Sequence, residues 1–216
     1  MTENANKVCN PEPIIERYKR HGFDPLRIES ITEQLRQICY SGCSKILEIG
    51  VAGGFLRHCF KLFPQISHTT LDITEELSPD YVGSVTNMPF EDNQFDLVVC
   101  GQVLEHLSFN EFLPALKEIR RVAMRKVIIS LPDRTRHFGI AVCFARLGWF
   151  MFEWNPPKKK YARKELDSGG QHCWEIGCKG TRAKDVIRKI KDAGFKIERQ
   201  YRLWKHPWHR LFILRV

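Results

Sequence analysis

A carboxylate and a glycine-rich turn stand together at residues 48–54, in the order Glu-Ile-Gly-Val-Ala-Gly-Gly. An apolar run precedes them and a helix-forming run follows, so the turn is predicted to join a strand to a helix. Glycines there let backbone N–H groups and the helix N-terminus approach a ligand closely. The order does not match the Gly-x-Gly-x-x-Gly pattern of dinucleotide sites, and Glu48 would repel a pyrophosphate. A nucleotide-like cofactor with a positive charge and no phosphate fits better.

A second carboxylate, Asp72, stands at the end of the next predicted strand, residues 68–73. A carboxylate in that place can accept hydrogen bonds from the two vicinal hydroxyls of a ribose. Alone, Asp72 is explained equally well as a helix cap or a turn residue. A dinucleotide enzyme would also use a carboxylate here. Asp72 therefore supports a nucleotide-like cofactor without choosing among the cofactor classes.

These segments resemble the class I S-adenosylmethionine-dependent methyltransferases, in particular a small-molecule, type 11-like subgroup. The first motif of that family is commonly Glu/Asp-x-Gly-x-Gly-x-Gly, and residues 48–54 match it except that Ala52 replaces the middle glycine. Residues 83–90 are similar to the third-strand loop of the family. The most specific match is 95–107, which is similar to a fourth strand leading into a Val-Leu-Glu-His helix. The resemblance covers about residues 45–133.

The resemblance implies that S-adenosylmethionine is the cofactor and S-adenosylhomocysteine the product. This cofactor carries an ammonium and a sulfonium group and no phosphate, in agreement with the charge of the turn. Ser84 stands where the family usually has an acidic contact to the adenine amino group. The cofactor-binding residues predicted in this way are Glu48, Gly50, Ala52, Gly53, Gly54, Asp72, Ile73, Ser84, Val85, Cys100, Gly101 and Gln102.

Methyl transfer requires little acid–base catalysis from the protein. Methyl transfer from a sulfonium is an in-line displacement in which the protein mainly aligns the reactants. A base is needed only if the acceptor must lose a proton. The first candidate is His172, because residues 171–175 resemble a family segment that lies over the mouth of the active site. Asp133 and His137, just after the fifth predicted strand, are further candidates.

Two other groups of residues could carry chemistry, and both have plainer explanations. Glu105 and His106 are interpreted equally well as reactive groups or as capping and packing residues. The chain has eight cysteines, and the spacing of the pairs Cys39/Cys43 and Cys173/Cys178 lacks the two tight Cys or His pairs of a structural zinc site. Several of these cysteines are expected to be reduced core residues. We therefore predict no metal site.

The elements that position these residues alternate between strands and helices along 216 residues. Such alternation, with mostly continuous apolar strands, predicts an α/β fold around a largely parallel sheet. We expect a Rossmann-like three-layer sandwich in one domain, residues 1–216, with seven strands and an antiparallel hairpin at the C-terminal edge. Strands are predicted at 45–50, 68–73, 80–84, 95–100, 126–131, 195–203 and 209–216. Helices are predicted at 14–21, 26–39, 55–63, 104–107, 110–123 and 181–193.

A long, irregular insert is expected at 134–180, and a segment of that length in a compact domain is usually a lid or binding element. It combines an apolar and aromatic stretch, 138–154, with lysines at 158–160, and we expect it to lie over the substrate site. A helical dimer face is the alternative. Residues 134–216 hold 20 Lys and Arg against 7 Asp and Glu. This excess favours an anionic partner, although the basic helix at 181–193 is also explained as a solvated face.

The expected function is methyl transfer to an O or N atom of a small acceptor, for which the basic segment favours an anionic, phosphorylated molecule. An RNA, protein or lipid-linked acceptor is an alternative, as is peripheral contact with a membrane. A cofactor-binding protein without turnover, or an oxidoreductase with an aberrant turn, represents a different class. The sequence has no run of about 20 apolar residues, and its first 13 residues lack the apolar core of a signal peptide. We therefore expect a cytoplasmic protein.

Overall fold

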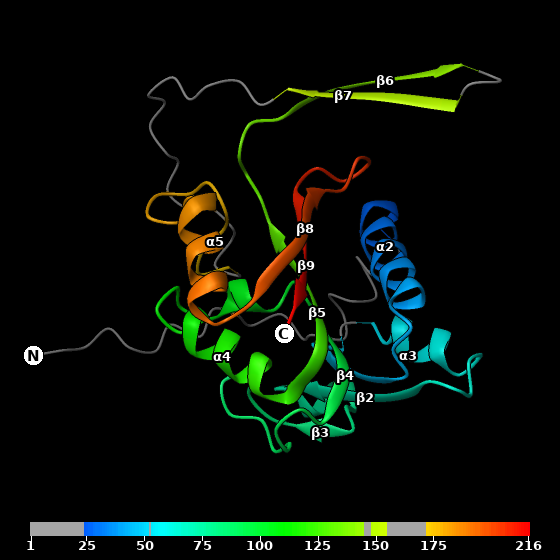
Figure 1. The fold of residues 1–216 in the computed structure, drawn as a ribbon, viewed down its shortest axis with the longest axis vertical. Coiled ribbons are helices and arrows are strands. Elements are labelled where there is room, and N and C mark those ends of the chain that lie inside the picture. Colours follow the sequence, from blue (N-terminus) through cyan, green and yellow to red (C-terminus); the bar gives the residue numbers. More distant parts are fainter. Residues whose placement is uncertain (1–23, 52, 145–147, 155–171) are drawn as a thin grey trace, which may run out of the picture.

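The computed structural model describes residues 24–51, 53–144, 148–154 and 172–216 (Figure 1). Within these residues, one sheet has seven strands in the order β3-β2-β1-β4-β5-β9-β8. Strands β1 to β5 are parallel, and β9 runs antiparallel between β5 and β8. The strands are β1 Lys45–Ile49, β2 Ser67–Asp72, β3 Tyr81–Val82, β4 Phe95–Gly101, β5 Ala123–Pro132, β8 Lys196–Arg202 and β9 His209–Arg215. The predicted mostly parallel sheet with an antiparallel C-terminal hairpin is confirmed.

Helices cover both faces of this sheet, with α2 and α3 on one side and α4 and α5 on the other (Figure 1). Successive strand residues point to opposite faces, so the apolar strands feed two hydrophobic cores. Ile46 packs with the core under α2 and α3, whereas its neighbour Leu47 packs with the core under α4 and α5. The helices are α2 Pro25–Ser41, α3 Phe55–Phe60, α4 Phe112–Val122 and α5 Ala183–Asp192. The three-layer sandwich expected from the sequence is confirmed.

Helix α2 begins and ends where its local sequence directs. The Asp24 carboxylate accepts a hydrogen bond from the Leu26 N–H at 2.9 Å, and Pro25 occupies the first helical position. Gly42 ends the helix in the left-handed conformation, with a φ of 64°. The helix predicted at residues 14–21 lies outside the described residues.

Two short elements differ from the expected helices and strands. The helix expected at 104–107 is a single 3-10 turn, η2 Leu104–His106, which ends because Leu107 is extended. A similar turn, η1 Glu75–Leu77, follows β2. The strand β3 keeps only two residues, Tyr81–Val82, because its neighbour β2 ends opposite them.

The insert contains an ordered antiparallel hairpin of β6 Phe138–Phe144 and β7 Gly148–Trp154. The expectation of an irregular segment is corrected here, since aromatic and β-branched residues favour strands. The hairpin extends away from the seven-stranded sheet (Figure 1). At its base Gly139 lies against the Trp204 ring, which a Cβ would approach within 2.7 Å. The expected lysine cluster at 158–160 lies outside the described residues.

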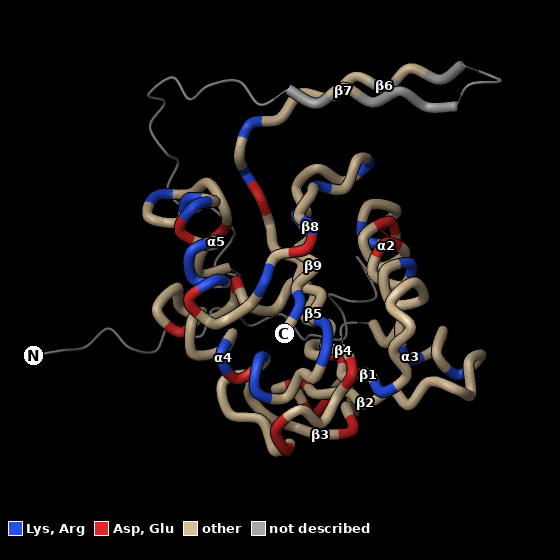
Figure 2. The backbone as a smooth tube through the Cα atoms, viewed as in Figure 1, with Lys and Arg blue, Asp and Glu red and all other residues tan. Residues whose placement is uncertain are grey.

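Charge is distributed unevenly over this framework. Lys and Arg gather on α5 and along the β8–β9 side of the molecule, whereas Asp and Glu are numerous around β2 and β3 (Figure 2). Among the residues that the structure describes, no helix has the length and apolar character needed to span a membrane.

Candidate functional site

A cavity of about 290 Å³ opens where β1 and β4 end, beside the N-terminal half of α2. The strand order reverses between β1 and β4, and ligands of open α/β sheets bind at the carboxyl ends of the strands at such a point. Five of the predicted cofactor-binding residues line the cavity, and so does the predicted base His172. These five residues are Glu48, Gly50, Gly53, Gly101 and Gln102.

The turn after β1 requires glycine at two positions. Gly50 has a φ of 86°, and a Cβ there would overlap the Val103 side chain. Gly54 has a φ of 70° and precedes the first residue of α3. Left-handed backbone of this kind is routinely adopted only by glycine. Ala52 lies outside the described residues.

Glu48 contributes a buried carboxylate to the wall of the cavity and is 5% exposed. Its Oε2 lies 3.0 Å from Nε2 of His68 on β2. Burial raises the pKa of Glu48, and the contact with His68 opposes that rise. His68 of the neighbouring strand β2 therefore fixes the position of the Glu48 carboxylate in the cavity wall.

Asp72 ends β2 and ties that strand to the glycine turn. One carboxylate oxygen accepts from the Val51 N–H at 2.8 Å and the other from the Thr74 N–H at 2.9 Å. The next residue, Ile73, holds an apolar side chain 75% exposed. Four predicted cofactor-binding residues at or just after the ends of β2 and β3 do not line the cavity: Asp72, Ile73, Ser84 and Val85.

The end of β4 forms the opposite wall. A Cβ on Gly101 would come within 2.8 Å of the Gln34 side chain of α2, so helix and strand approach closely. Gln102 has a φ of 56°, an uncommon conformation for a residue with a side chain. Its N–H donates to the Ser130 carbonyl at 3.1 Å, and its side-chain amide donates to the Ser130 hydroxyl at 3.2 Å. Gly54 and the buried Cys100 are sequence neighbours of lining residues but do not line the cavity themselves.

His172 reaches the cavity because the last part of the insert pairs with the end of β5. The Ile176 N–H donates to the Pro132 carbonyl at 2.9 Å, and the Cys173 N–H donates to the Glu105 carbonyl at 2.8 Å. Trp174 is buried between these bonds, with its ring 4.8 Å from that of Phe112. The backbone that follows His172 is thus bound to η2 and to the end of β5.

A carboxylate orients the imidazole of His172. Its Nδ1 lies 2.8 Å from Oε1 of Glu175, which also forms an ion pair with Arg134. Burial alone would raise the pKa of Glu175, but the hydrogen bonds from His172 and Arg134 lower it below its usual value. An ionised carboxylate only accepts hydrogen bonds, so Nδ1 is the donor, and in a neutral imidazole Nε2 would then carry the lone pair.

The other two predicted bases lie in different surroundings. Asp133 is fully enclosed, and its carboxylate accepts from Arg202 at 3.1 Å and from Arg210 at 2.6 Å. It also accepts from the N–H and hydroxyl of Thr135 at 2.8 and 2.6 Å. These contacts bind the end of β5 to β8 and β9. His137 lies at the base of the hairpin and is absent from the cavity lining.

Three histidines of the cavity were not predicted as site residues, namely His106, His206 and His209. The His106 ring lies 5.0 Å from that of His172, and the His206 ring 3.9 Å from that of His209. Burial lowers the pKa of His209 to about 3, and the neighbouring His206 adds to the effect. The sequence run His-Pro-Trp-His at 206–209 could have indicated these residues. It leads into β9, and because β9 is antiparallel to β5, its first residue lies beside the carboxyl end of β5 at the site.

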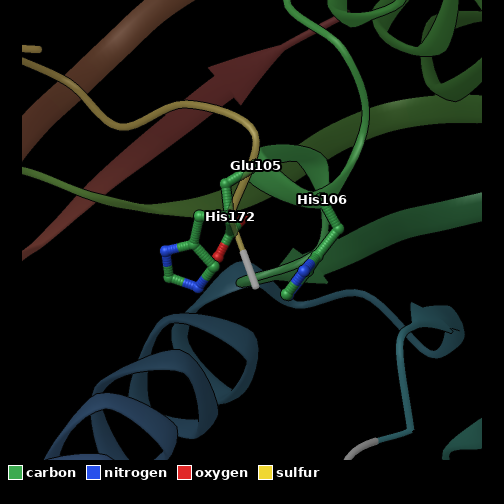
Figure 3. Close-up of side chains that lie close together, drawn as sticks. All are labelled: Glu105, His106 and His172. Carbon is green, nitrogen blue, oxygen red and sulfur yellow. The ribbon is translucent and has the colours of Figure 1, made fainter. Parts of the chain in front are cut away.

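Glu105 is the least accessible acid of the site. Its side chain is completely buried, and no described residue forms a hydrogen bond with either carboxylate oxygen. Burial raises the pKa of Glu105 to about 8. Glu105, His106 and His172 lie together, with the carboxylate between the two imidazoles (Figure 3).

Comparisons with known proteins agree with this arrangement. Residues 47–131 match a family model described as a methyltransferase domain. An uncharacterized protein of Methanocaldococcus jannaschii is 49% identical over 43 residues, which is 20% of this chain and 18% of that protein. The chain therefore matches less than a fifth of the length of this curated relative.

Solved structures share the fold at low sequence identity. A methyltransferase from Aquifex aeolicus superimposes with a TM-score of 0.60 and 17% identity, covering 95% of this chain and 100% of the other. One from Archaeoglobus fulgidus gives 0.61 and 13%, with the same coverage. Magnesium protoporphyrin IX methyltransferase from Synechocystis, with bound S-adenosylhomocysteine, gives 0.57 and 15%, covering 96% and 89%.

The glycine turn lies at the reversal point of the sheet, the overall fold is similar to that of these methyltransferase structures, and the family match spans the turn and residues 105–106. The chain thus has the fold of S-adenosylmethionine-dependent methyltransferase structures, and its residues 47–131 match the family model of a methyltransferase domain.

Proposed function

We propose that the chain transfers a methyl group from S-adenosylmethionine to an O or N atom of an acceptor bound in the cavity at the ends of β1 and β4. The observation that carries this proposal is the lining of the cavity, where Glu48 and the glycine turn face Gly101 and Gln102. The Synechocystis structure with the same fold has S-adenosylhomocysteine bound, which supports the choice of cofactor.

Each part of the cofactor has a candidate partner. Glu48 would attract the ammonium group, and Asp72 would accept from the ribose hydroxyls in addition to its backbone contacts. The exposed side chain of Ile73 would cover one face of the adenine, with Ser84 and Val85 at its edge. The methionine end would lie along Cys100, Gly101 and Gln102.

The reaction needs alignment more than acid–base chemistry. The acceptor atom attacks the methyl carbon, the S–CH₃ bond breaks, and its electron pair stays on sulfur to give S-adenosylhomocysteine. Where the acceptor carries a proton, Nε2 of His172 is the candidate base in the metal-free site, because Glu175 holds Nδ1. Glu175 would hold the imidazole in one tautomer and orientation, as the aspartate does for the histidine in the catalytic triad of serine hydrolases. The roles of Asp133 and His137 as bases stay predictions.

The proposed acceptor is small and anionic. Arg27 lines the cavity, and Lys and Arg predominate on the α5 and β8–β9 side of the molecule (Figure 2). A positive potential there would concentrate an anionic, phosphorylated substrate. We further propose that the insert 134–180 covers the acceptor, since His172 comes from it and lines the cavity.

Transfer of a tritiated methyl group to a cell extract tests the proposal and separates acceptor classes. The extract is divided after reaction into an ultrafiltrate, an organic phase, an RNase-released fraction and acid-precipitated protein. The proposal predicts label in the ultrafiltrate, and label in another fraction would identify a different acceptor class. A lack of label in every fraction, with cofactor binding intact, would instead favour a binding protein without turnover.

One observation favours a lipid-linked acceptor as the second candidate. Phe138, Ile140 and Val142 alternate along β6 and so share a face, and Phe152 is paired with Ile140 across the hairpin. All four side chains are exposed, from 39% to 68%. An exposed apolar face next to Arg134 and Arg136 suits an anionic lipid surface.

Vesicle flotation tests this second candidate. Vesicles with and without phosphatidylserine are compared for the parent chain and for Ile140→Asp, whose side chain stands in the centre of the face. If the hairpin docks on lipid, the parent chain is expected to float with anionic vesicles, whereas the Ile140→Asp variant is expected to remain at the bottom of the gradient. Equal behaviour of both proteins would remove the candidate.

A further inference from the structure

Three side chains in the site have the types and the spacing of a metal centre. Glu105 and His106 come from η2, and His172 comes from the last part of the insert. One donor atom from each lies within 4.8 Å of the other two. In Figure 3 the Glu105 carboxylate stands between the two imidazole rings. Two histidines and one carboxylate are a common ligand set for divalent zinc, iron, manganese and cobalt.

The state of Glu105 gives an independent reason for a ligand at this point. Its carboxylate is completely buried, and neither oxygen has a hydrogen-bond partner among the described residues. A buried polar group without a partner is costly, and such groups in native proteins usually mark a missing ion or water. Oxygens that face two imidazoles are well placed to bind a cation.

The residues behind His172 match the support that metal-binding histidines usually have. Nδ1 donates to Glu175 at 2.8 Å, so in the neutral imidazole Nε2 is the nitrogen that can bind a cation. A carboxylate behind the ring fixes the tautomer and raises the basicity of a metal-binding histidine. The Cys173 N–H donates to the Glu105 carbonyl at 2.8 Å, which holds the two ligand-bearing segments together.

The position of the cluster connects it with the reaction. His106 and His172 line the cavity together with Gly101 and Gln102, where the methionine end of the cofactor is proposed to lie. Catalytic metal sites use three protein ligands and leave further positions for water or substrate. A cation in this cluster would present those positions to the acceptor.

We propose that Glu105, His106 and His172 bind a divalent transition-metal cation, and that the cation binds an oxygen of the methyl acceptor. This role deepens the proposed methyl transfer and rests on it. The bound acceptor hydroxyl loses its proton to solvent water because the cation lowers the pKa of the hydroxyl. The resulting oxygen attacks the methyl carbon, the S–CH₃ bond breaks, and its electron pair remains on sulfur. In the metal-loaded site His172 is a ligand and does not serve as the base.

Cobalt and manganese titrations test the site without any acceptor. The full chain is treated with EDTA, dialysed, and titrated with CoCl₂ under a visible spectrum and with MnCl₂ in a calorimeter. We expect one equivalent of each metal to bind, with a cobalt spectrum that lacks the charge-transfer bands of thiolate ligands. Cys173→Ser, beside the cluster, is expected to bind as the parent does. Loss of binding in that variant would assign the metal to cysteine and overturn the proposal.

Isosteric variants locate the site. Glu105→Gln and His172→Gln are expected to weaken metal binding at least tenfold, and Glu175→Gln about tenfold or more. Glu91→Gln, an exposed acid, is the matched control and is expected to bind as the parent does. Equal metal binding by the parent and Glu105→Gln, or no binding by the parent, would overturn the proposal.

Cofactor binding distinguishes this proposal from the proposed function. Glu105→Gln is expected to bind S-adenosylhomocysteine as the parent does, which also shows that the variant is folded. A parent chain that binds metal but not the cofactor would contradict the proposed function and leave the metal site standing. A parent that binds the cofactor but no metal would contradict the metal site alone.

Discussion

Asp133 stands out at the level of single residues, because one buried carboxylate holds three strands together. It receives hydrogen bonds from Arg202 and Arg210, and the side chains of Asp133 and Arg202 are 0% and 4% exposed. Removing one partner of a buried ion pair leaves the other charge uncompensated. The arrangement indicates a structural role at the edge of the site.

Asp133→Asn is expected to lower the free energy of unfolding by about 3 kcal/mol, since breaking a buried pair typically costs that much. Urea unfolding followed by circular dichroism measures the change. Cofactor binding by the folded variant should match that of the parent. Unchanged stability combined with loss of methyl transfer would instead favour the sequence-based hypothesis that Asp133 is a base.

His209 is expected to make stability depend on pH. Burial lowers its pKa to about 3 in the folded chain, whereas an unfolded histidine titrates near 6.5. Between these values the unfolded state binds a proton that the folded state does not, so stability falls as pH falls from about 6.5 towards 3. His209→Gln should reduce the slope by up to about 1.4 kcal/mol per pH unit. Thermal unfolding at pH 6.5, 5.5 and 4.5 measures it, and identical slopes would contradict the assignment.

The sequence allowed part of the site to be predicted residue by residue. Glu48 and Gly50 lie at the end of β1 and Gln102 directly follows β4, so local motifs are enough to place them in the cavity. His209 begins the antiparallel strand β9, whose neighbour β5 is more than 70 positions away, and His206 lies in the loop before it, so local patterns do not place either residue in the cavity. Whether Glu105 is a reactive group or a packing residue depends on its burial, and burial is set by the tertiary structure rather than by the local sequence.

At the scale of elements, the turn between β1 and α3 is the part with the least freedom. Gly50→Ala would place a methyl group against Val103 and force a residue with a side chain to a φ of 86°. We expect this variant to lose about 1–3 kcal/mol of stability and at least tenfold in cofactor affinity.

Gly53→Ala is the matched control, because a Cβ there meets nothing within 4 Å. Its unfolding free energy is expected to stay within about 0.5 kcal/mol of the parent. Thermal unfolding compares the two variants. Equal destabilisation by both would show that the turn is not constrained at Gly50 as described.

Continuous apolar strands and capped helices were predictable because their signals are local. The hairpin of β6 and β7 was not, since its apolar faces do not show the alternation with polar residues that marks a strand on a hydrophobic core. The shortening of η2 to one turn also escaped prediction. It follows β4 through Gln102, whose left-handed backbone is set by its bonds to Ser130 of β5.

At the scale of the whole molecule, the order of strands decides where the chemistry lies. The reversal between β1 and β4 creates the cavity, and β2 brings Asp72 to its side. The loop before β9 and the first residue of β9 add His206 and His209 to the lining. Five segments that are separated in sequence thus line one cavity: the first half of α2, the glycine turn with the start of α3, the end of β4 with η2, residue 172, and the loop that leads into β9.

Isothermal titration of the full chain with S-adenosylmethionine tests the central claim most directly. We predict saturable binding of one equivalent, weakened about 10–100-fold in Asp72→Asn, because a hydrogen bond to a charged group contributes about 1.5–3 kcal/mol. Asp192→Asn, an exposed acid at the end of α5, is the control and is predicted to bind as the parent does. An absence of saturable binding, or equal affinity of the parent and Asp72→Asn, would contradict this account.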